Sequence, residues 1–248
     1  MYPVICTIGP VQLYSYGLML GIAFLVAMHF TSKRAHLFNI KEDFITNLGI
    51  CFLIAGVIGA RALFVVLNVD YFLENPLQAL YIHKGGLVYY GGFILAFFAG
   101  IIYGRRHKVS VLDGADLVVP FLALAHSIGR IGCFLNGCCY GKPTESFIGV
   151  VFPHTHIKVY PTQLLSALGL LIIFVVLFLI QKRRKFKGQV LALYLIIYGG
   201  FRFLIEFLRG DLFGVFYNLT VTQLISMLLI ISGSILYIRL MKNKYWII

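Results

Sequence analysis

Residues with the chemistry of a catalytic site lie between positions 126 and 144, where four glycines interrupt an apolar run. His126 and Arg130 are four residues apart, so both side chains lie on one face of a helix. A histidine beside a permanent cation stays neutral and can accept a proton, although a hydrogen-bonded packing role is an equal alternative. An arginine at membrane depth marks a functional site by default. We call residues 126–144 the signature loop, and we expect it to handle both a proton and an anionic group.

A second polar helix face lies within residues 190–208. Tyr198, Arg202 and Glu206 recur every four residues and therefore share one side of the helix, and Arg209 follows. The carboxylate offsets the desolvation of the guanidinium and orients it, and guanidinium geometry suits a phosphate. The alternative is an ion pair with a purely structural role. The spacing favours an arginine held in place for a phosphate.

The elements that position these residues follow from composition. The chain has 248 residues, of which 60% are hydrophobic and 12% charged, with a mean hydropathy of +0.91. A soluble domain carries about 25% charge. We predict an all-α polytopic membrane protein with one domain, residues 1–248. Apolar runs near the length of a membrane span predict seven helices, at about 13–30, 44–67, 86–104, 114–130, 164–181, 190–208 and 220–241.

Basic residues fix the expected orientation. They cluster in alternate connections, after the first, third, fifth and seventh spans. The net charge of +12 therefore indicates membrane topology, and no nucleic-acid partner is expected. The N-terminus is predicted outside and the C-terminus in the cytoplasm. Arg61, Arg130 and Arg202 then all lie toward the outer leaflet, which predicts one cationic cavity. Snorkelling of each arginine to the headgroups is the alternative.

Two further motifs open spans from the outer side. Residues 85–92 place two glycine pairs around Leu87-Val88-Tyr89-Tyr90, and the tyrosines form either an interfacial belt or a cavity lining. Tyr-Pro-Thr-Gln at 160–163 begins the fifth span. Gln163 is then expected in the same outer layer of the membrane as the three arginines.

Three cysteines, Cys133, Cys138 and Cys139, occur within the signature loop. Their spacing does not match the paired Cys-x2-Cys pattern of zinc sites. A disulfide on an oxidising face is an alternative, and small packing residues are the favoured interpretation. We therefore expect neither a metal nor a cofactor.

The chain resembles the prolipoprotein diacylglyceryl transferase family. Residues 129–141, Gly-Arg-Ile-Gly-Cys-Phe-Leu-Asn-Gly-Cys-Cys-Tyr-Gly, are similar to that family's Gly-Arg-x-Gly-Asn-Phe-x-Asn-Gly-Glu-x-aromatic-Gly signature. Other matches occur in family order: Tyr16-Gly17, Gly59-Ala60-Arg61, the glycine pairs of 85–92, Asp116 with Pro120, Pro161-Thr162-Gln163-Leu164, and Tyr198-Gly199 through Arg202 to Glu206. The chain departs from the family at five positions, namely Tyr90 for histidine, Cys133 for asparagine, Cys138 for glutamate, Leu165 for tyrosine and Ser166 for glutamate.

The resemblance implies an enzyme of the bacterial cytoplasmic (inner) membrane that acts in lipoprotein biosynthesis. It would transfer a diacylglyceryl group from phosphatidylglycerol to the lipobox cysteine of a prolipoprotein, forming a thioether and releasing glycerol phosphate. We assign catalytic roles to His126, Tyr90, Arg130 and Arg202, with His126 replacing the family's base. Substrate contacts are assigned to Tyr16, Arg61, Asn136, Tyr140, Gln163, Tyr198, Glu206 and Arg209. The alternative is a transporter-like relative that binds an anionic lipid or solute in an outward cavity.

Overall fold

A computed structural model describes residues 2–8, 11–81, 85–153, 155–210 and 219–242. The chain forms two compact units, one made of Met1–Thr31 and Ala115–Ile248 and the other of Ser32–Gly114. Whether the two behave as the single domain expected from the sequence stays a prediction.

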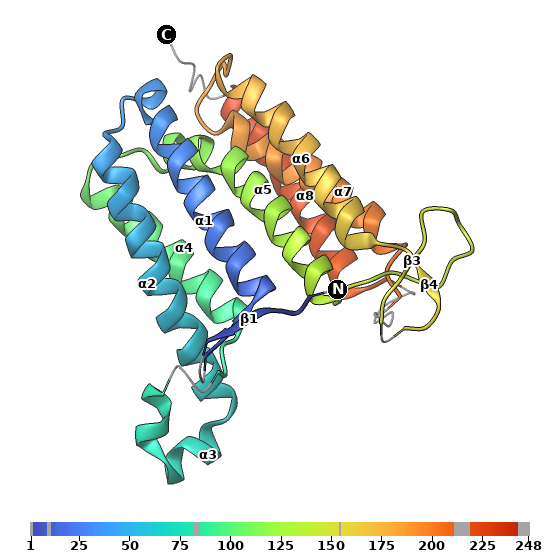
Figure 1. Cartoon of the computed structure of the whole chain (residues 1–248). Helices are drawn as coiled ribbons and strands as arrows, with labels where there is room; N and C mark the ends of the chain where they lie inside the picture. Colours follow the sequence, from blue (N-terminus) through green and yellow to red (C-terminus); the bar gives the residue numbers. More distant parts are fainter. Residues whose placement is uncertain (1, 9–10, 82–84, 154, 211–218, 243–248) are drawn as a thin grey trace. The chain divides into compact units, whose positions relative to one another are not determined.

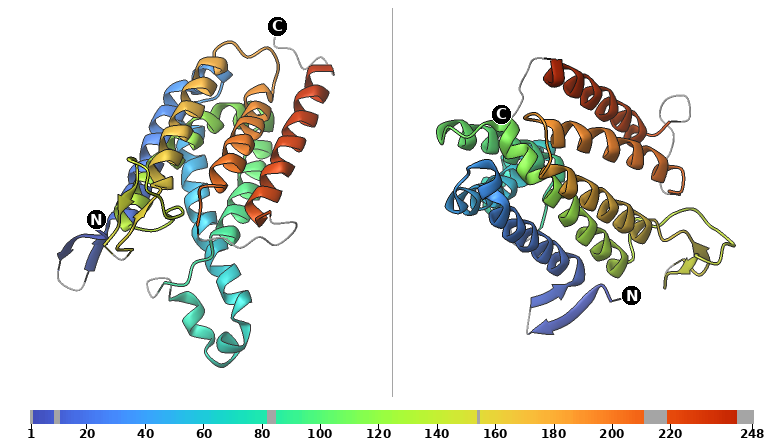
Figure 2. Two further views of the ribbon diagram at one scale, coloured as in Figure 1. Left: turned by 90° about the vertical axis from the view of Figure 1, so that its right-hand side faces the viewer. Right: turned by 90° about the horizontal axis from the view of Figure 1, so that it is seen from above.

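The first unit is a bundle of long helices (Figure 1). It contains most of α1 (Ser15–Arg34) and α5 (Val111–Asn136), together with α6 (Thr162–Gln181), α7 (Gln189–Glu206) and α8 (Val221–Lys242). Figure 2 shows α7 between α6 and α8. One buried cluster joins three of the helices, through Val119 and Ala123 of α5, Ile173 and Leu177 of α6, and Val190 and Tyr194 of α7. Each pair is four residues apart, so one face of each helix supplies the core.

The second unit contains η1 (Ala35–Phe38), α2 (Glu42–Leu67), α3 (Val69–Glu74), η2 (Pro76–Leu80) and α4 (Tyr89–Arg106). Its helices α2 and α4 touch backbone to backbone at Gly59 and Gly91. A Cβ added at Gly59 would overlap the carbonyl oxygen of Gly91, and a Cβ at Gly91 would overlap the carbonyl oxygen of Gly59. Such close approach is how membrane helices gain packing energy, because lipid offers no hydrophobic drive for association.

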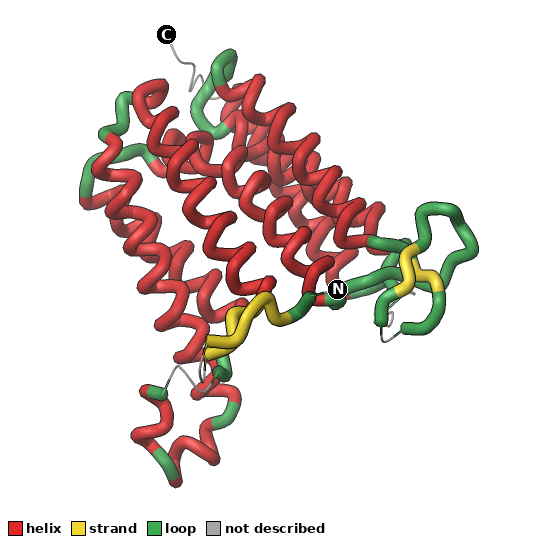
Figure 3. The backbone as a smooth tube through the Cα atoms, viewed as in Figure 1, coloured by secondary structure: helices red, strands yellow, loops and turns green. Residues whose placement is uncertain are grey.

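Short strands lie outside the helices (Figure 3). Strands β1 (Val4–Ile8) and β2 (Val11–Tyr14) form an antiparallel hairpin before α1, and β3 (Val150–Val151) pairs with β4 (Lys158–Val159) in the segment between α5 and α6. None of these strands was predicted from the sequence.

All seven predicted spans coincide with helices, and the all-α membrane class is confirmed. Among the described residues, six helices are long and apolar enough to cross a membrane, namely α1 extended to Phe38, α2, α5, α6, α7 and α8. Helix α4 occupies the remaining predicted span but is not among the six. Its 18 residues include four glycines, three tyrosines and two arginines, which lower its apolar character.

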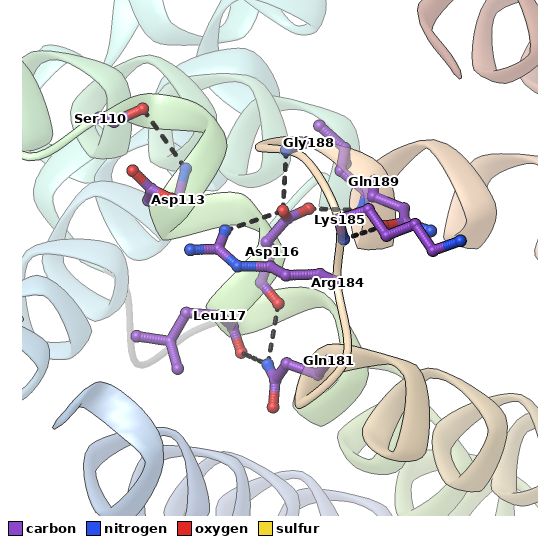
Figure 4. Close-up of polar contacts among 10 residues, drawn as sticks. Ser110, Asp113, Asp116, Leu117, Gln181, Arg184, Lys185, Gly188 and Gln189 are labelled. Carbon is purple, nitrogen blue, oxygen red and sulfur yellow. Dashed lines mark hydrogen bonds and ion pairs between the residues drawn. The ribbon is translucent and has the colours of Figure 1, made fainter. Parts of the chain in front are cut away.

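A buried carboxylate ties α5 to the turn between α6 and α7 (Figure 4). The side chain of Asp116 is fully buried and pairs with Arg184 Nη1 at 3.1 Å. Its oxygens also accept the backbone N–H groups of Gly188 at 2.7 Å and Leu191 at 2.9 Å. These donors surround the start of α7, where the helix dipole favours an anion. Gln181 adds a hydrogen bond from its Nε2 to the Asp116 carbonyl at 2.8 Å.

Replacing Asp116 by asparagine should destabilise the fold. The amide would place its own donor against N–H groups and would remove the ion pair with Arg184, at a cost of about 3 kcal/mol. The thermal midpoint in detergent should fall by about 6–12 °C. Glu145→Gln, which removes a charge from an exposed position, is the matched control and should leave the midpoint nearly unchanged. Equal midpoints for the two variants would contradict the stabilising role of this contact.

Candidate active site

The predicted polar residues of the first unit gather at the end of the bundle where α5 and α7 finish and α6 and α8 begin. Backbone contacts join these ends: Gly141 forms an antiparallel bridge with Arg209, Lys142 N–H donates to the Leu208 carbonyl at 2.8 Å, and Gly141 N–H donates to the Tyr160 carbonyl at 2.8 Å. We call this region the signature end. It brings together segments that are about 70 residues apart in the sequence.

His126 and Arg130 interact as their spacing predicts. Arg130 Nε donates to His126 Nε2 at 3.3 Å. Because a guanidinium has no acceptor, Nε2 must carry the lone pair, and the imidazole is neutral. The imidazole ring also lies 5.8 Å from the ring of Tyr198, centroid to centroid, so α5 and α7 meet here. The geometry therefore provides a histidine able to accept a proton, with Arg130 occupying its lone pair.

Arg202 is held by Glu206, one helical turn further along α7. Arg202 Nη2 lies 2.8 Å from Glu206 Oε2, and the carboxylate is fully buried. Its other oxygen accepts the Thr220 hydroxyl at 2.9 Å. Arg130 and Arg209 are both close enough for their charges to act on Arg202. Among the described residues of this contact group, one carboxylate accompanies three guanidiniums, so the group carries an excess of positive charge suited to a phosphate.

The loop after α5 is fixed by hydrogen bonds from the first turn of α6. Gly137 adopts a positive φ of 74°, which turns the chain back at the helix end. Gln163 Nε2 then donates to the Cys138 carbonyl at 2.6 Å, and the Thr162 hydroxyl donates to the Cys139 carbonyl at 2.7 Å. Gln163, which we predicted to contact substrate, thus supports the loop through its nitrogen, while its buried Oε1 accepts no hydrogen bond from the part of the chain that the structure describes.

The three cysteines of the signature loop converge. The sulfur atoms of Cys133, Cys138 and Cys139 all lie within 4.8 Å of one another, and all three are free thiols. A hydrogen bond from the Cys133 thiol lowers the pKa of the Cys139 thiol below its ordinary value, and the charge of Arg209 acts in the same direction. Burial raises the pKa of the Cys138 thiol, whose side chain is also hydrogen-bonded to Asn136. The predicted substrate residue Asn136 therefore borders this cluster.

Arg61 lies in the second unit and is enclosed by backbone carbonyls. Its Nε donates to Ala79 at 2.8 Å, its Nη1 to Gly85 at 2.7 Å and Gly86 at 3.1 Å, and its Nη2 to Gln78 at 2.6 Å. Four of the five N–H donors of a guanidinium are thereby used. This arrangement explains how a charge is tolerated in α2, and it gives Arg61 a role in shaping the loop before α4. Its contact with substrate stays a prediction.

The predicted tyrosines occupy different environments. Tyr16 begins α1 and packs at Gly132 of α5, where an added Cβ would lie 3.4 Å from the Tyr16 ring. The Tyr140 ring packs against Phe152 in a tilted arrangement, with 5.5 Å between ring centroids, and it lines a cavity of about 310 Å³ beside the β3–β4 segment. Tyr90 lies in the second unit on α4 and is 63% exposed. Its membership of the site stays a prediction.

Two supporting residues of the site, Thr220 and Thr162, were not predicted from the sequence. Thr220 contacts Glu206, and Thr162 holds the Cys139 carbonyl. Each lies at the start of a helix, where threonine is common. That signal was present in the sequence, but it did not reveal which distant residue each hydroxyl would reach.

The fold and this region define a helical membrane protein of several spans, with a cationic and proton-accepting site at one end of a bundle. A family model described as "Prolipoprotein diacylglyceryl transferase" matches residues 3–239. The chain belongs to the prolipoprotein diacylglyceryl transferase family.

Individual relatives agree with this assignment. The phosphatidylglycerol–prolipoprotein diacylglyceryl transferase of Clostridium tetani is 38% identical over 239 residues, which cover 94% of this chain and 95% of the relative. The phosphatidylglycerol–prolipoprotein diacylglyceryl transferase 2 of Clostridium perfringens is 36% identical over 236 residues, which cover 91% of this chain and 90% of the relative. That of Clostridioides difficile is 34% identical, covering 96% and 95%.

These comparisons confirm the predicted family, the prediction of a transferase, and diacylglyceryl transfer as its activity. They favour the transferase over the transporter-like alternative. The roles of individual site residues stay predictions.

Proposed function

We propose that the chain transfers the diacylglyceryl group of phosphatidylglycerol to the lipobox cysteine thiol of a prolipoprotein. The observation that carries this proposal beyond the family assignment is the arginine cluster beside a neutral histidine at the signature end. A cation cluster suits the phosphate of the donor lipid, and a proton acceptor suits the thiol.

The proposed reaction is a displacement at carbon. The thiolate sulfur attacks the carbon of the diacylglyceryl group that carries the phosphate. A carbon–sulfur bond forms there, and the bond between that carbon and the phosphate oxygen breaks. The electron pair of the broken bond leaves on the phosphate oxygen of glycerol phosphate. Arg130 and Arg202 stabilise this growing negative charge, because preorganised cations in a dry site stabilise charge more strongly than water does.

In the same proposal, phosphate binding and proton transfer are coupled through Arg130. In the free protein its Nε occupies the lone pair of His126 Nε2. When Arg130 turns toward the lipid phosphate, Nε2 becomes available for the proton of the thiol. Tyr90 is assigned a hydrogen bond to substrate. Tyr198 positions the imidazole through its ring contact.

The remaining assigned residues complete the site. Arg209 adds positive charge, whereas Asn136 and Gln163 hold the signature loop. Tyr16 and Tyr140 are proposed to contact the acyl or peptide portion of the substrates, and Arg61 to act through the loop that it organises.

His126→Gln should lower transfer by about 10²-fold, because general-base catalysis typically contributes at least that much. Glutamine keeps an acceptor for Arg130 but cannot take up a proton at neutral pH. The assay follows the mass gain of a lipobox peptide in phosphatidylglycerol vesicles. A peptide with serine in place of the lipobox cysteine is the negative control. Full activity in His126→Gln would remove this residue as the base.

We further propose that the enzyme lies in the bacterial cytoplasmic membrane with its N-terminus outside. The distribution of basic residues between the spans supports this orientation. Cys6 in β1 is exposed and provides a reporter. In a background that carries Cys133→Ser, Cys138→Ser and Cys139→Ser, a maleimide that cannot cross membranes should label Cys6 in intact spheroplasts, and it should not label the same protein with Cys6→Ser added. Labelling that appears only after membrane rupture would reverse the orientation.

A further inference from the structure

The signature loop brings three thiols into a small, supported volume. Cys133 is buried near the end of α5, and the loop returns so that Cys138 N–H donates to the Cys133 carbonyl at 3.1 Å. Cys139 adopts φ 62°, a left-handed conformation that is costly for a residue other than glycine. Its carbonyl and that of Cys138 are both fixed from α6. A strained backbone held by surrounding hydrogen bonds is common at functional sites.

The geometry of the three sulfurs is close to that of a metal site. Zn²⁺ binds thiolates at about 2.3 Å, which places the sulfurs of a tetrahedral site about 3.8 Å apart. The three sulfurs here lie within 4.8 Å of one another, so small side-chain rotations reach that geometry. Among the described residues, no histidine, aspartate or glutamate joins the group. Three protein ligands with an open fourth position are typical of catalytic rather than structural zinc.

The charges around the cluster suit such a complex. Three thiolates and one Zn²⁺ carry a net charge of −1, and a fourth thiolate would make it −2. The positive charges of Arg130 and Arg209 both act on Cys139. Burial of an anionic complex is favourable only beside compensating charge. The cysteine cluster lies beside such compensating charge, because Arg130 and Arg209 both act on Cys139.

We propose that Cys133, Cys138 and Cys139 bind one Zn²⁺ and leave its fourth position open to the substrate thiol. This inference rests on the proposed function. The S–H proton passes to His126, and the zinc-bound sulfur then forms the carbon–sulfur bond as glycerol phosphate departs. Zinc changes neither its oxidation state nor its three protein ligands. A coordinated thiol is deprotonated, so this site supplies the thiolate where position 90 carries tyrosine in place of the family's histidine.

Metal binding is tested first, without any activity measurement. Protein with Cys6→Ser is reduced, stripped with a chelator, and titrated with Zn²⁺ or with Cd²⁺, whose thiolate complexes absorb in the ultraviolet. We expect one metal per chain, and at least a ten-fold weaker binding in Cys133→Ser, Cys138→Ser and Cys139→Ser. Cys51→Ser, in α2, is the matched control with unchanged binding. Unchanged binding in all three variants, or a disulfide within the trio of protein purified without reductant, would overturn the site.

The second arm compares transfer by stripped and zinc-loaded protein. Loss of about 10²-fold on stripping, restored by Zn²⁺, is the expected result. Equal transfer by both forms would overturn the role of zinc in thiol activation while leaving the proposed function intact. No transfer by either form, with one zinc bound per folded chain, would overturn that role together with the proposed function.

Discussion

Arg130→Ala is expected to lower diacylglyceryl transfer by roughly 10²- to 10³-fold, the loss seen when one preorganised donor to a developing oxyanion is removed. Arg130 lies one turn after His126 and donates to its Nε2. The variant therefore loses the cation that binds the lipid phosphate. It also leaves the lone pair of His126 Nε2 permanently without its arginine donor. The assay is the peptide mass gain in phosphatidylglycerol vesicles.

The variant Arg130→Lys separates the contribution of the positive charge at position 130 from that of the guanidinium's paired N–H donors. Lysine keeps the positive charge but cannot offer two parallel N–H donors to a phosphate. We expect this variant to stay well below the parent protein in transfer while its melting midpoint is unchanged. Parent-level transfer in Arg130→Ala would mean that Arg130 does not bind the lipid phosphate, and the phosphate would then have to bind elsewhere in the protein.

Arg202→Ala should reduce transfer by a similar factor, but the single variant is ambiguous. It leaves Glu206 as an unpaired carboxylate in a fully buried position, which costs about 3–5 kcal/mol in stability. A decrease in transfer then reflects either lost chemistry or lost structure. The informative protein is the double variant Arg202→Ala with Glu206→Gln, because it removes both charges together.

The double variant should recover most of the thermal midpoint and none of the transfer. The amide oxygen of the introduced glutamine can still accept the hydroxyl that Thr220 donates to Glu206 in the parent. Arg183→Ala, which removes an exposed arginine after α6, is the matched control and should transfer at the parent rate. Recovery of both stability and transfer in the double variant would make the Arg202 pair structural.

The spans were predictable because hydrophobic length is a property of local sequence. Each predicted run coincides with a long helix, and the helical spacing of His126 with Arg130, and of Arg202 with Glu206, also predicted real contacts. These interactions link residues four apart on one helix, so they require no knowledge of how helices pack.

Contacts that depend on tertiary structure were not predictable in this way. The partners of Arg61 are backbone carbonyls 17 to 25 positions away, which no residue type announces. The cysteines were interpreted as packing residues because their spacing does not match known zinc patterns. Their convergence depends on a left-handed backbone at Cys139, a conformation that its side chain does not favour.

The contact between Gly59 and Gly91 has a consequence for genetics. A clash between two side chains can be relieved by making the opposing side chain smaller, because packed cores tolerate changes that conserve total volume. Here a new side chain on either helix meets a main-chain carbonyl, which every amino acid carries. No change at Gly59 can make room for a residue at Gly91, nor the reverse. A search for second-site suppressors of Gly91→Val should therefore return true revertants and no compensating partner at position 59.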